Sequence, residues 1–121
     1  MPGVAIKRYE RVSARKVNRL LGLIRGEAVI KARNTLVFLH SRTKIVVLKT
    51  LNSAIANLKN KEGKIKVDDN DLYVKSATAD GATMLKRWKA APHGMPHMIR
   101  RRTCHITITV DRRNQAVKKG A

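Results

Sequence analysis

Apolar residues recur at helical spacing near the start of the chain. The first such set is Val17, Leu20, Leu21 and Ile24. These positions share one face of a helix and predict an amphipathic first helix. Ser13 precedes the set and is placed to cap the helix, because a serine hydroxyl can accept the exposed N–H groups of the first turn. Gly26 follows the set and is placed to end the helix in a left-handed conformation.

The same periodicity predicts two more helices, over about 27–39 and 42–60. Their apolar positions are Val29, Ala32, Leu36 and Leu39 in the second, and in the third Ile45, Leu48, Leu51, Ile55 and Leu58, widened by Val47 and Ala54. Glu27 suits the positive end of the second helix dipole, and Ser41 is placed to cap the third. We expect the third helix to be the most buried element.

From residue 72 the pattern changes to the alternation typical of strands. Residues 72–79 and 106–110 alternate, the second run with Ile106, Ile108 and Val110 on one face. A weaker run through Val4, Ile6 and Tyr9 predicts an edge strand. The sequence Asp-Asp-Asn-Asp at 68–71 predicts a solvated turn.

The segment from about 81 to 102 lies between the two strong strands and has almost no apolar alternation. Turn residues at 91–97 divide it in two, which predicts a long β-hairpin without a core beneath it. Each leg has about ten residues and could reach roughly 30 Å. Because an isolated hairpin is marginal in water, it requires a partner to order it.

These elements predict an α+β fold, with three helices packed on a small antiparallel sheet and a long protruding β-hairpin. One domain is expected over 1–121. It comprises a globular body at about 1–80 and 104–111, an extended hairpin at about 81–103, and a basic flexible tail at 112–121.

The charge balance points to a polyanionic partner. The chain has 27 Lys and Arg residues against 8 Asp and Glu, a formal net charge of +19. Such a protein repels itself and favours binding to nucleic acid. Aromatic residues make up only 3% of the chain, which argues against a sheet that stacks several bases on its rings.

The basic residues concentrate at the two ends of the chain. Residues 1–26 hold seven Lys and Arg with one acid, and residues 81–121 hold ten with one acid. The alternative interpretation of these basic runs is a solvated face or a localisation signal. The run Arg100-Arg101-Arg102 suits a folded RNA backbone, because guanidinium groups bind phosphates through two parallel hydrogen bonds.

The sequence offers little for catalysis or metal binding, and we expect no catalytic residue, no metal and no cofactor. Cys104 and His105 are neighbours in a strand and should point to opposite faces. His93 and His97 have a possible metal spacing but flank Gly94 and Pro96 in a loop. Trp88 allows two interpretations: its ring stacks on an RNA base, which we favour, or it packs across the hairpin.

Four motifs, in this order, resemble large-subunit ribosomal protein family twenty-two. They are Val12-Ser13-Ala14-Arg15-Lys16-Val17 with Leu23-Ile24-Arg25-Gly26, Ser53-Ala54-Ile55-Ala56-Asn57, Leu72-Tyr73-Val74, and Arg101-Arg102-Thr103-Cys104-His105-Ile106-Thr107. The likeness covers about residues 5–111. It implies a structural constituent of the large ribosomal subunit that binds its rRNA, supports subunit assembly and lines the polypeptide exit tunnel with its hairpin.

The resemblance and the basic runs together define the expected sites. The expected RNA-binding residues are Arg11, Arg15, Lys16, Arg19, Arg25, Lys86, Arg87, Trp88, Lys89, Arg100, Arg101, Arg102 and Thr103. The expected tunnel-facing tip is Ala90, Ala91, Pro92, His93, Gly94, Met95, Pro96 and His97. The family usually places several Arg and Lys at this tip, where this sequence has histidines, prolines and a methionine.

The expected partners are large-subunit rRNA, neighbouring ribosomal proteins and, at the tip, the nascent polypeptide. We expect no membrane and no homo-oligomer. The absence of an apolar span or a signal core, with a single cysteine, predicts a cytoplasmic ribosome or its organellar equivalent. Two other classes remain as alternatives: a DNA-compacting architectural protein, and a nuclease using Asp68, Asp69, Asp71 and Asp80 to hold a metal.

Overall fold

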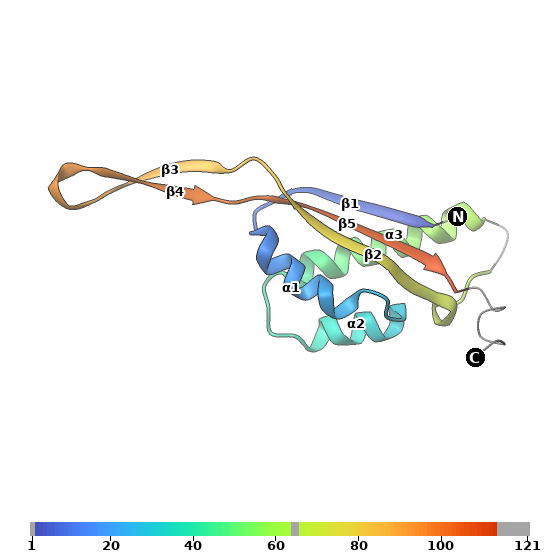
Figure 1. Ribbon diagram of the computed structural model, residues 1–121. Helices are drawn as coiled ribbons and strands as arrows, with labels where there is room; N and C mark the ends of the chain where they lie inside the picture. Colours follow the sequence, from blue (N-terminus) through green and yellow to red (C-terminus); the bar gives the residue numbers. More distant parts are fainter. Residues whose placement is uncertain (1, 64–65, 114–121) are drawn as a thin grey trace.

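The computed structural model describes residues 2–63 and 66–113 and confirms the expected α+β fold (Figure 1). Three helices cover one face of a three-stranded sheet: α1 (Ala14–Ile24), α2 (Val29–Phe38) and α3 (Lys44–Glu62). The antiparallel sheet has the order β1-β5-β2, formed by β1 (Gly3–Glu10), β2 (Leu72–Gly81) and β5 (Cys104–Arg112). Two further strands, β3 (Leu85–Ala90) and β4 (Pro96–Arg101), form a hairpin that projects from the body. We call residues 85–101 the arm.

The central strand β5 organises the core. Its side chains alternate between the helix-covered face and the open face, so that Cys104, Ile106, Ile108 and Val110 are fully buried. Helix α3 packs against β1 and β5, and α1 packs against β2. The strand predicted at 106–110 is confirmed and extends further at both ends, because β5 pairs with a neighbour on each side. Arg112, expected to open the flexible tail, is the last residue of β5, and the rest of that predicted tail from 114 onward lies outside the described residues.

Helix α1 follows its prediction closely. All four residues of the expected stripe are buried, and Gly26 has a φ of 74° with its N–H donating to the carbonyl of Val74 at 2.9 Å. The left-handed ending was therefore correctly predicted. Ser13 does occupy the N-cap position, but its side chain makes no capping hydrogen bond, so the expected cap was wrong.

Helix α2 begins two residues later than the predicted start at Glu27. The backbone of this region is used by the sheet instead: the Glu27 carbonyl accepts the Val74 N–H at 2.9 Å, and Ala28 bridges to Tyr73. Glu27 therefore lies outside the first turn, and its carboxylate pairs with Lys31 at 2.9 Å.

Helix α3 is long and well buried, but its start and its apolar stripe were partly mispredicted. The N-cap residue is Thr43 rather than Ser41. Ile45, expected in the core, is 55% exposed, while Val47 is fully buried. Thr50 is also buried, and this costs little because its hydroxyl donates to the Val46 carbonyl at 2.8 Å.

A bulge in β2 reverses the strand's facing pattern. The pairing with β5 shifts between Val74 and Ser76, and one extra residue in a strand changes which face the following side chains occupy. Leu72 and Val74 point into the core before the bulge, and Ala77 and Ala79 do so after it. The simple alternation predicted over 72–79 would place Ser76 and Thr78 on the same face as Leu72 and Val74, and it was therefore wrong beyond Val74.

Strand β1 is the expected edge strand, and it lies close to α3. Val4 and Ile6 lie on the open face, while Gly3 and Ala5 face the helices. A Cβ atom at Gly3 would stand 2.5 Å from Leu58 Cβ and 2.7 Å from Leu58 N. Only glycine allows this approach of strand to helix.

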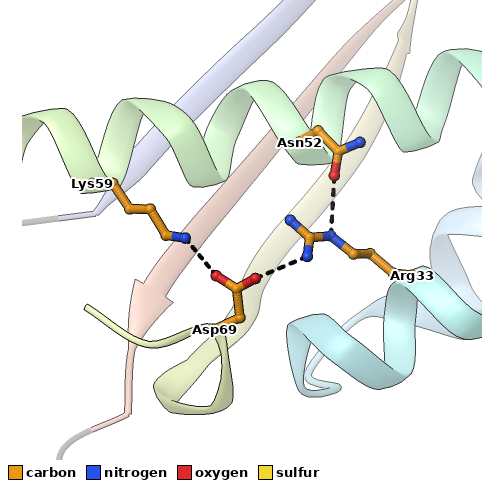
Figure 2. A network of polar contacts seen from close by, with 4 residues as sticks. All are labelled: Arg33, Asn52, Lys59 and Asp69. Atoms are coloured by element: carbon orange, nitrogen blue, oxygen red, sulfur yellow. Dashed lines mark hydrogen bonds and ion pairs between the residues drawn. The ribbon is translucent and has the colours of Figure 1, made fainter. Parts of the chain in front are cut away.

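The acidic turn at 68–71 is less solvated than predicted, because Asp69 joins three parts of the body (Figure 2). Its carboxylate accepts from Arg33 of α2 at 2.9 Å and from Lys59 of α3 at 2.7 Å. Arg33 also donates to Asn52 of α3 at 3.1 Å. The Lys59 hydrogen bond, together with Arg33, lowers the pKa of Asp69 against the opposing effect of burial.

Replacing Gly3 by Ala should destabilise the protein by about 1–3 kcal/mol, since the added methyl group forces β1 away from α3. Urea unfolding followed by circular dichroism measures this. Gly22→Ala is the matched control: it lies within α1 with open space around it, and alanine there should be neutral or stabilising. Equal stability of the two variants would contradict the close-approach argument.

Asp69→Asn should reduce stability by about 1–2 kcal/mol at neutral pH, because it removes the charge that Arg33 and Lys59 share. The stabilisation by Asp69 is complete above its unfolded pKa of about 4 and is lost as the pH falls through its lowered folded pKa. The difference between the variant and the unaltered chain should therefore shrink in acid. The control is Asp68→Asn, which changes the exposed neighbouring residue. A stability difference between Asp69→Asn and the unaltered chain that persists at low pH would exclude an electrostatic cause.

Candidate RNA-binding surface

The arm carries cations on both of its faces. Its register places Lys86 opposite Arg100 on one face, and Leu85 opposite Arg101 on the other. Arg87 and Lys89 share the second face with Arg101. All of these basic side chains are exposed. Directly opposed like charges such as Lys86 and Arg100 destabilise a strand pair, so the arm favours an anion that lies against it.

The arm has neither acidic residues nor a core of its own. The sequence from 81 to 110 contains no Asp or Glu, so no neighbouring carboxylate in this stretch offsets its cations. Every residue of β3 is exposed, and Ile99 is the only half-buried residue of β4. The arm is therefore a two-stranded ribbon with solvent on both faces, as the sequence predicted (Figure 1).

Trp88 remains available for a contact outside the protein. It lies opposite Met98, so the two side chains share one face, as the packing interpretation expected. The indole is nevertheless 66% exposed and Met98 is 37% exposed. The ring is large and flat, and a base could stack on its open side.

Helix α1 presents a second basic surface near the root of the arm. Arg15, Lys16 and Arg19 are all exposed, on the side away from the buried stripe. Arg15 and Arg19 are one turn apart, where like charges repel. This repulsion favours a phosphate lying along the helix.

The guanidinium group of Arg25 makes two hydrogen bonds within the protein, one to a backbone carbonyl of β2 and one to a side chain of α1. It donates from Nε to the Ala77 carbonyl at 2.7 Å and from Nη2 to Asn18 Oδ1 at 3.3 Å. Asn18 in turn bonds both the N–H and the carbonyl of Ala79, each at 3.2 Å. Asn18 was not predicted as a functional residue, because a single polar residue beside an apolar stripe gives no signal in the sequence. It pins α1 to β2 and so holds Arg15, on the same helix, in a fixed place relative to the sheet.

Arg11 and Thr103 brace the root of the arm. Arg11 Nη1 donates to the Arg102 carbonyl at 3.0 Å. Thr103 is only 8% exposed, and its hydroxyl donates to the Thr83 carbonyl at 2.5 Å. The structure therefore gives Thr103 a bracing role, whereas the side chains of Arg100, Arg101 and Arg102 are exposed.

The tip is a tight turn built by Pro92–Gly94. His93 and Gly94 have φ values of 64° and 70°. Glycine adopts this left-handed conformation freely, and histidine is among the few other residues that are enriched in it. The expected tip residues are exposed except Ala91, which is half-buried. The tip carries no Lys, Arg, Asp or Glu, unlike the strongly basic legs behind it.

Cys104 and His105 lie on opposite faces, as the sequence predicted. Burial raises the pKa of the Cys104 thiol, and the Glu10 charge raises it further, so the thiol stays protonated. His105 Nδ1 accepts the backbone N–H of Tyr9 at 3.1 Å. These contacts make them structural residues rather than a thiolate–imidazole pair.

Among the described residues, no group of three or more His, Cys, Asp or Glu is arranged to hold a metal ion. Asp69 of the alternative nuclease site is instead bound by Arg33 and Lys59.

No helix in the described part of the chain is both long and apolar enough to cross a membrane.

The family model described as ribosomal protein L22p/L17e matches residues 5–111. Similar proteins named large ribosomal subunit protein uL22 occur in Microcystis aeruginosa (42% identity, 88% of this chain and 87% of the relative) and Bifidobacterium longum (40%, 100% and 99%). Another occurs in a Thermoanaerobacter species (43%, 91% and 96%).

The family match spans the three helices, nearly all of the sheet and the whole arm. The relatives from Bifidobacterium and Thermoanaerobacter are covered almost from end to end. On the strength of these matches, the chain belongs to the ribosomal protein L22p/L17e family.

Proposed function

We propose that the arm and the exposed face of α1 hold separate segments of large-subunit rRNA together. As a member of its family, the chain is a non-enzymatic structural protein of the large ribosomal subunit that binds rRNA and contributes to the exit tunnel. The observation that carries the residue-level proposal is the arm itself: two facing basic strands without a neighbouring acid or a core.

Phosphate binding relieves the repulsion built into both surfaces. In the arm, Lys86 faces Arg100, and on α1, Arg15 and Arg19 are one turn apart. A phosphate between such cations converts repulsion into two charge-assisted contacts. Counterions released from the RNA add to the binding free energy, which makes binding depend strongly on salt.

In this proposal, rRNA is bound on the body by Arg11, Arg15, Lys16 and Arg19. On the arm it is bound by Lys86, Arg87, Lys89 and the run 100–102. Trp88 adds a stacking contact. The hydrogen bonds of Arg25 and the burial of Thr103 assign these two residues chiefly to holding the surface in shape.

The tip, residues 90–97, is proposed to face the nascent polypeptide. Its tight turn, which carries no Lys, Arg, Asp or Glu, suits a surface that a moving chain must pass without binding, whereas the basic legs suit RNA. The body acts as a monomer beside neighbouring ribosomal proteins.

Replacing Arg100, Arg101 and Arg102 together by Ala should weaken binding to large-subunit rRNA at least tenfold at moderate salt. The slope of log K against log salt concentration should also become shallower by about 2–3, because each lost phosphate contact reduces it by roughly one. Filter binding across a salt series measures both.

The matched control is a second triple-Ala variant with the same loss of charge. It replaces residues that are exposed on the body rather than on the arm: Arg42, Lys49 and Lys66. Equal effects of the two variants, or equal binding to duplex DNA, would favour nonspecific charge.

A cysteine at His93 should cross-link to a stalled nascent chain when the protein is assembled into ribosomes, because the tip is proposed to face the tunnel. Gel analysis of the cross-linked chain checks this. A cysteine at Lys49 on α3 is the control, in a Cys104→Ser background to remove the native thiol. Cross-linking from position 49 but not from 93 would place the arm elsewhere.

A further inference from the structure

A pocket of about 590 Å³ lies where the arm leaves the body. One wall comes from the start of α1, with Ser13 and Arg15. The other comes from the two connections at the root of the arm, with Met84 on one and Arg102 on the other. We call these connections, residues 81–84 and 102–103, the elbow.

The pocket combines a cationic side with an apolar side. Arg15 and Arg102 both line it, and none of the described lining residues is acidic. Ser13, whose side chain makes no capping bond to α1, also lines it. Met84, 37% exposed, supplies an apolar and polarisable surface. An anion with a flat apolar part matches this combination.

The walls of the pocket are held in place before any ligand arrives. Arg11 ties the loop before α1 to the Arg102 carbonyl at 3.0 Å. The two elbow segments are joined by the Ala82 N–H, which donates to the Thr103 carbonyl at 3.0 Å, and by the Thr103 hydroxyl on Thr83. A site braced in this way loses little conformational freedom on binding.

We propose that this pocket receives a single nucleotide of the rRNA, turned out of its base stack. Arg15 and Arg102 bind the phosphate, and Met84 contacts the base. The inference rests on the proposed rRNA-binding function and assigns one particular contact to it. Proteins that read RNA commonly bind such splayed nucleotides, and the volume lies in the range of small-ligand pockets. An acidic side chain of a neighbouring protein would satisfy the arginines but leave the apolar side empty.

A nucleotide bound here would link α1 directly to the arm. Arg15 belongs to the body and Arg102 to the elbow, so one phosphate bridging them would set the angle at which the arm leaves the body. The pocket would thereby couple the seating of the body on RNA to the direction of the arm.

The test uses the full chain labelled with ¹³C in its methionine methyl groups. Met84 reports on the pocket, while Met95 and Met98, farther along the arm, report on general binding. The dinucleoside monophosphate ApA, which has one phosphodiester and two bases, should shift the Met84 signal saturably and move the other two much less. Adenosine, inorganic phosphate and an N-acetylated Glu-Glu dipeptide should each act much more weakly at equal concentration.

Arg15→Gln and Arg102→Gln should each weaken the Met84 response about tenfold, since each removes a charge-assisted phosphate contact. Arg112→Gln removes the same charge at the end of β5 farthest from the elbow and should leave the response unchanged. All three arginines are exposed, and an unchanged circular dichroism spectrum would verify that each variant is folded.

Three results would overturn the inference. Inorganic phosphate acting as strongly as ApA would mean a simple anion site, and a stronger response to the dipeptide would mean a protein ligand. Equal shifts of all three methionines that vanish together with salt would mean nonspecific attraction. Binding to intact rRNA, measured in parallel on the unaltered chain, distinguishes failure of the pocket from failure of the rRNA-binding function: preferential rRNA binding without a specific Met84 response would remove only the pocket.

Discussion

The antiparallel pairing of β2 with β5 is the interaction on which the rest of the structure depends. At one end of this pair, Val74 lies opposite Val110 and both face the helices; at the other end, Gly81 lies opposite Cys104. The same two chain segments then continue through the elbow into β3 and β4 (Figure 1). Burial of the inner halves therefore stabilises the position from which the outer halves project. Hydrophobic burial in the body thus sets the direction in which the arm projects, although the arm has no core of its own.

The basic surfaces impose an opposing constraint. Cations face one another across the arm and along α1, and each such pair destabilises the element that carries it. The apolar stripes of α1 and α3 and the inner face of β5 compensate within the body, and Asp69 ties α2 and α3 to the turn before β2 (Figure 2). The arm has no such compensation, and in the proposed binding mode rRNA phosphates provide it. The surface best suited to bind RNA is thus the part of the protein least stable without it.

The sequence by itself determined the number and order of the helices, the central strand, the existence of the arm and the concentration of charge on it. These features follow from local periodicity and composition, which a single segment carries within itself. The buried stripe of α1 and the left-handed Gly26 were predicted for this reason. The basic character of the arm was equally visible, since the segment from 81 to 110 lacks acids.

Only the tertiary structure decided features that depend on a second segment far away in the chain. The bulge after Val74 comes from the register with β5, and the need for glycine at position 3 comes from the approach of α3. The pairing of Asp69 and the meeting of Arg15 with Arg102 at one pocket likewise join distant residues. Periodicity shows which side of a helix or strand is apolar, but it does not show which other segment that side will contact. These tertiary contacts decide which basic residues remain open to RNA.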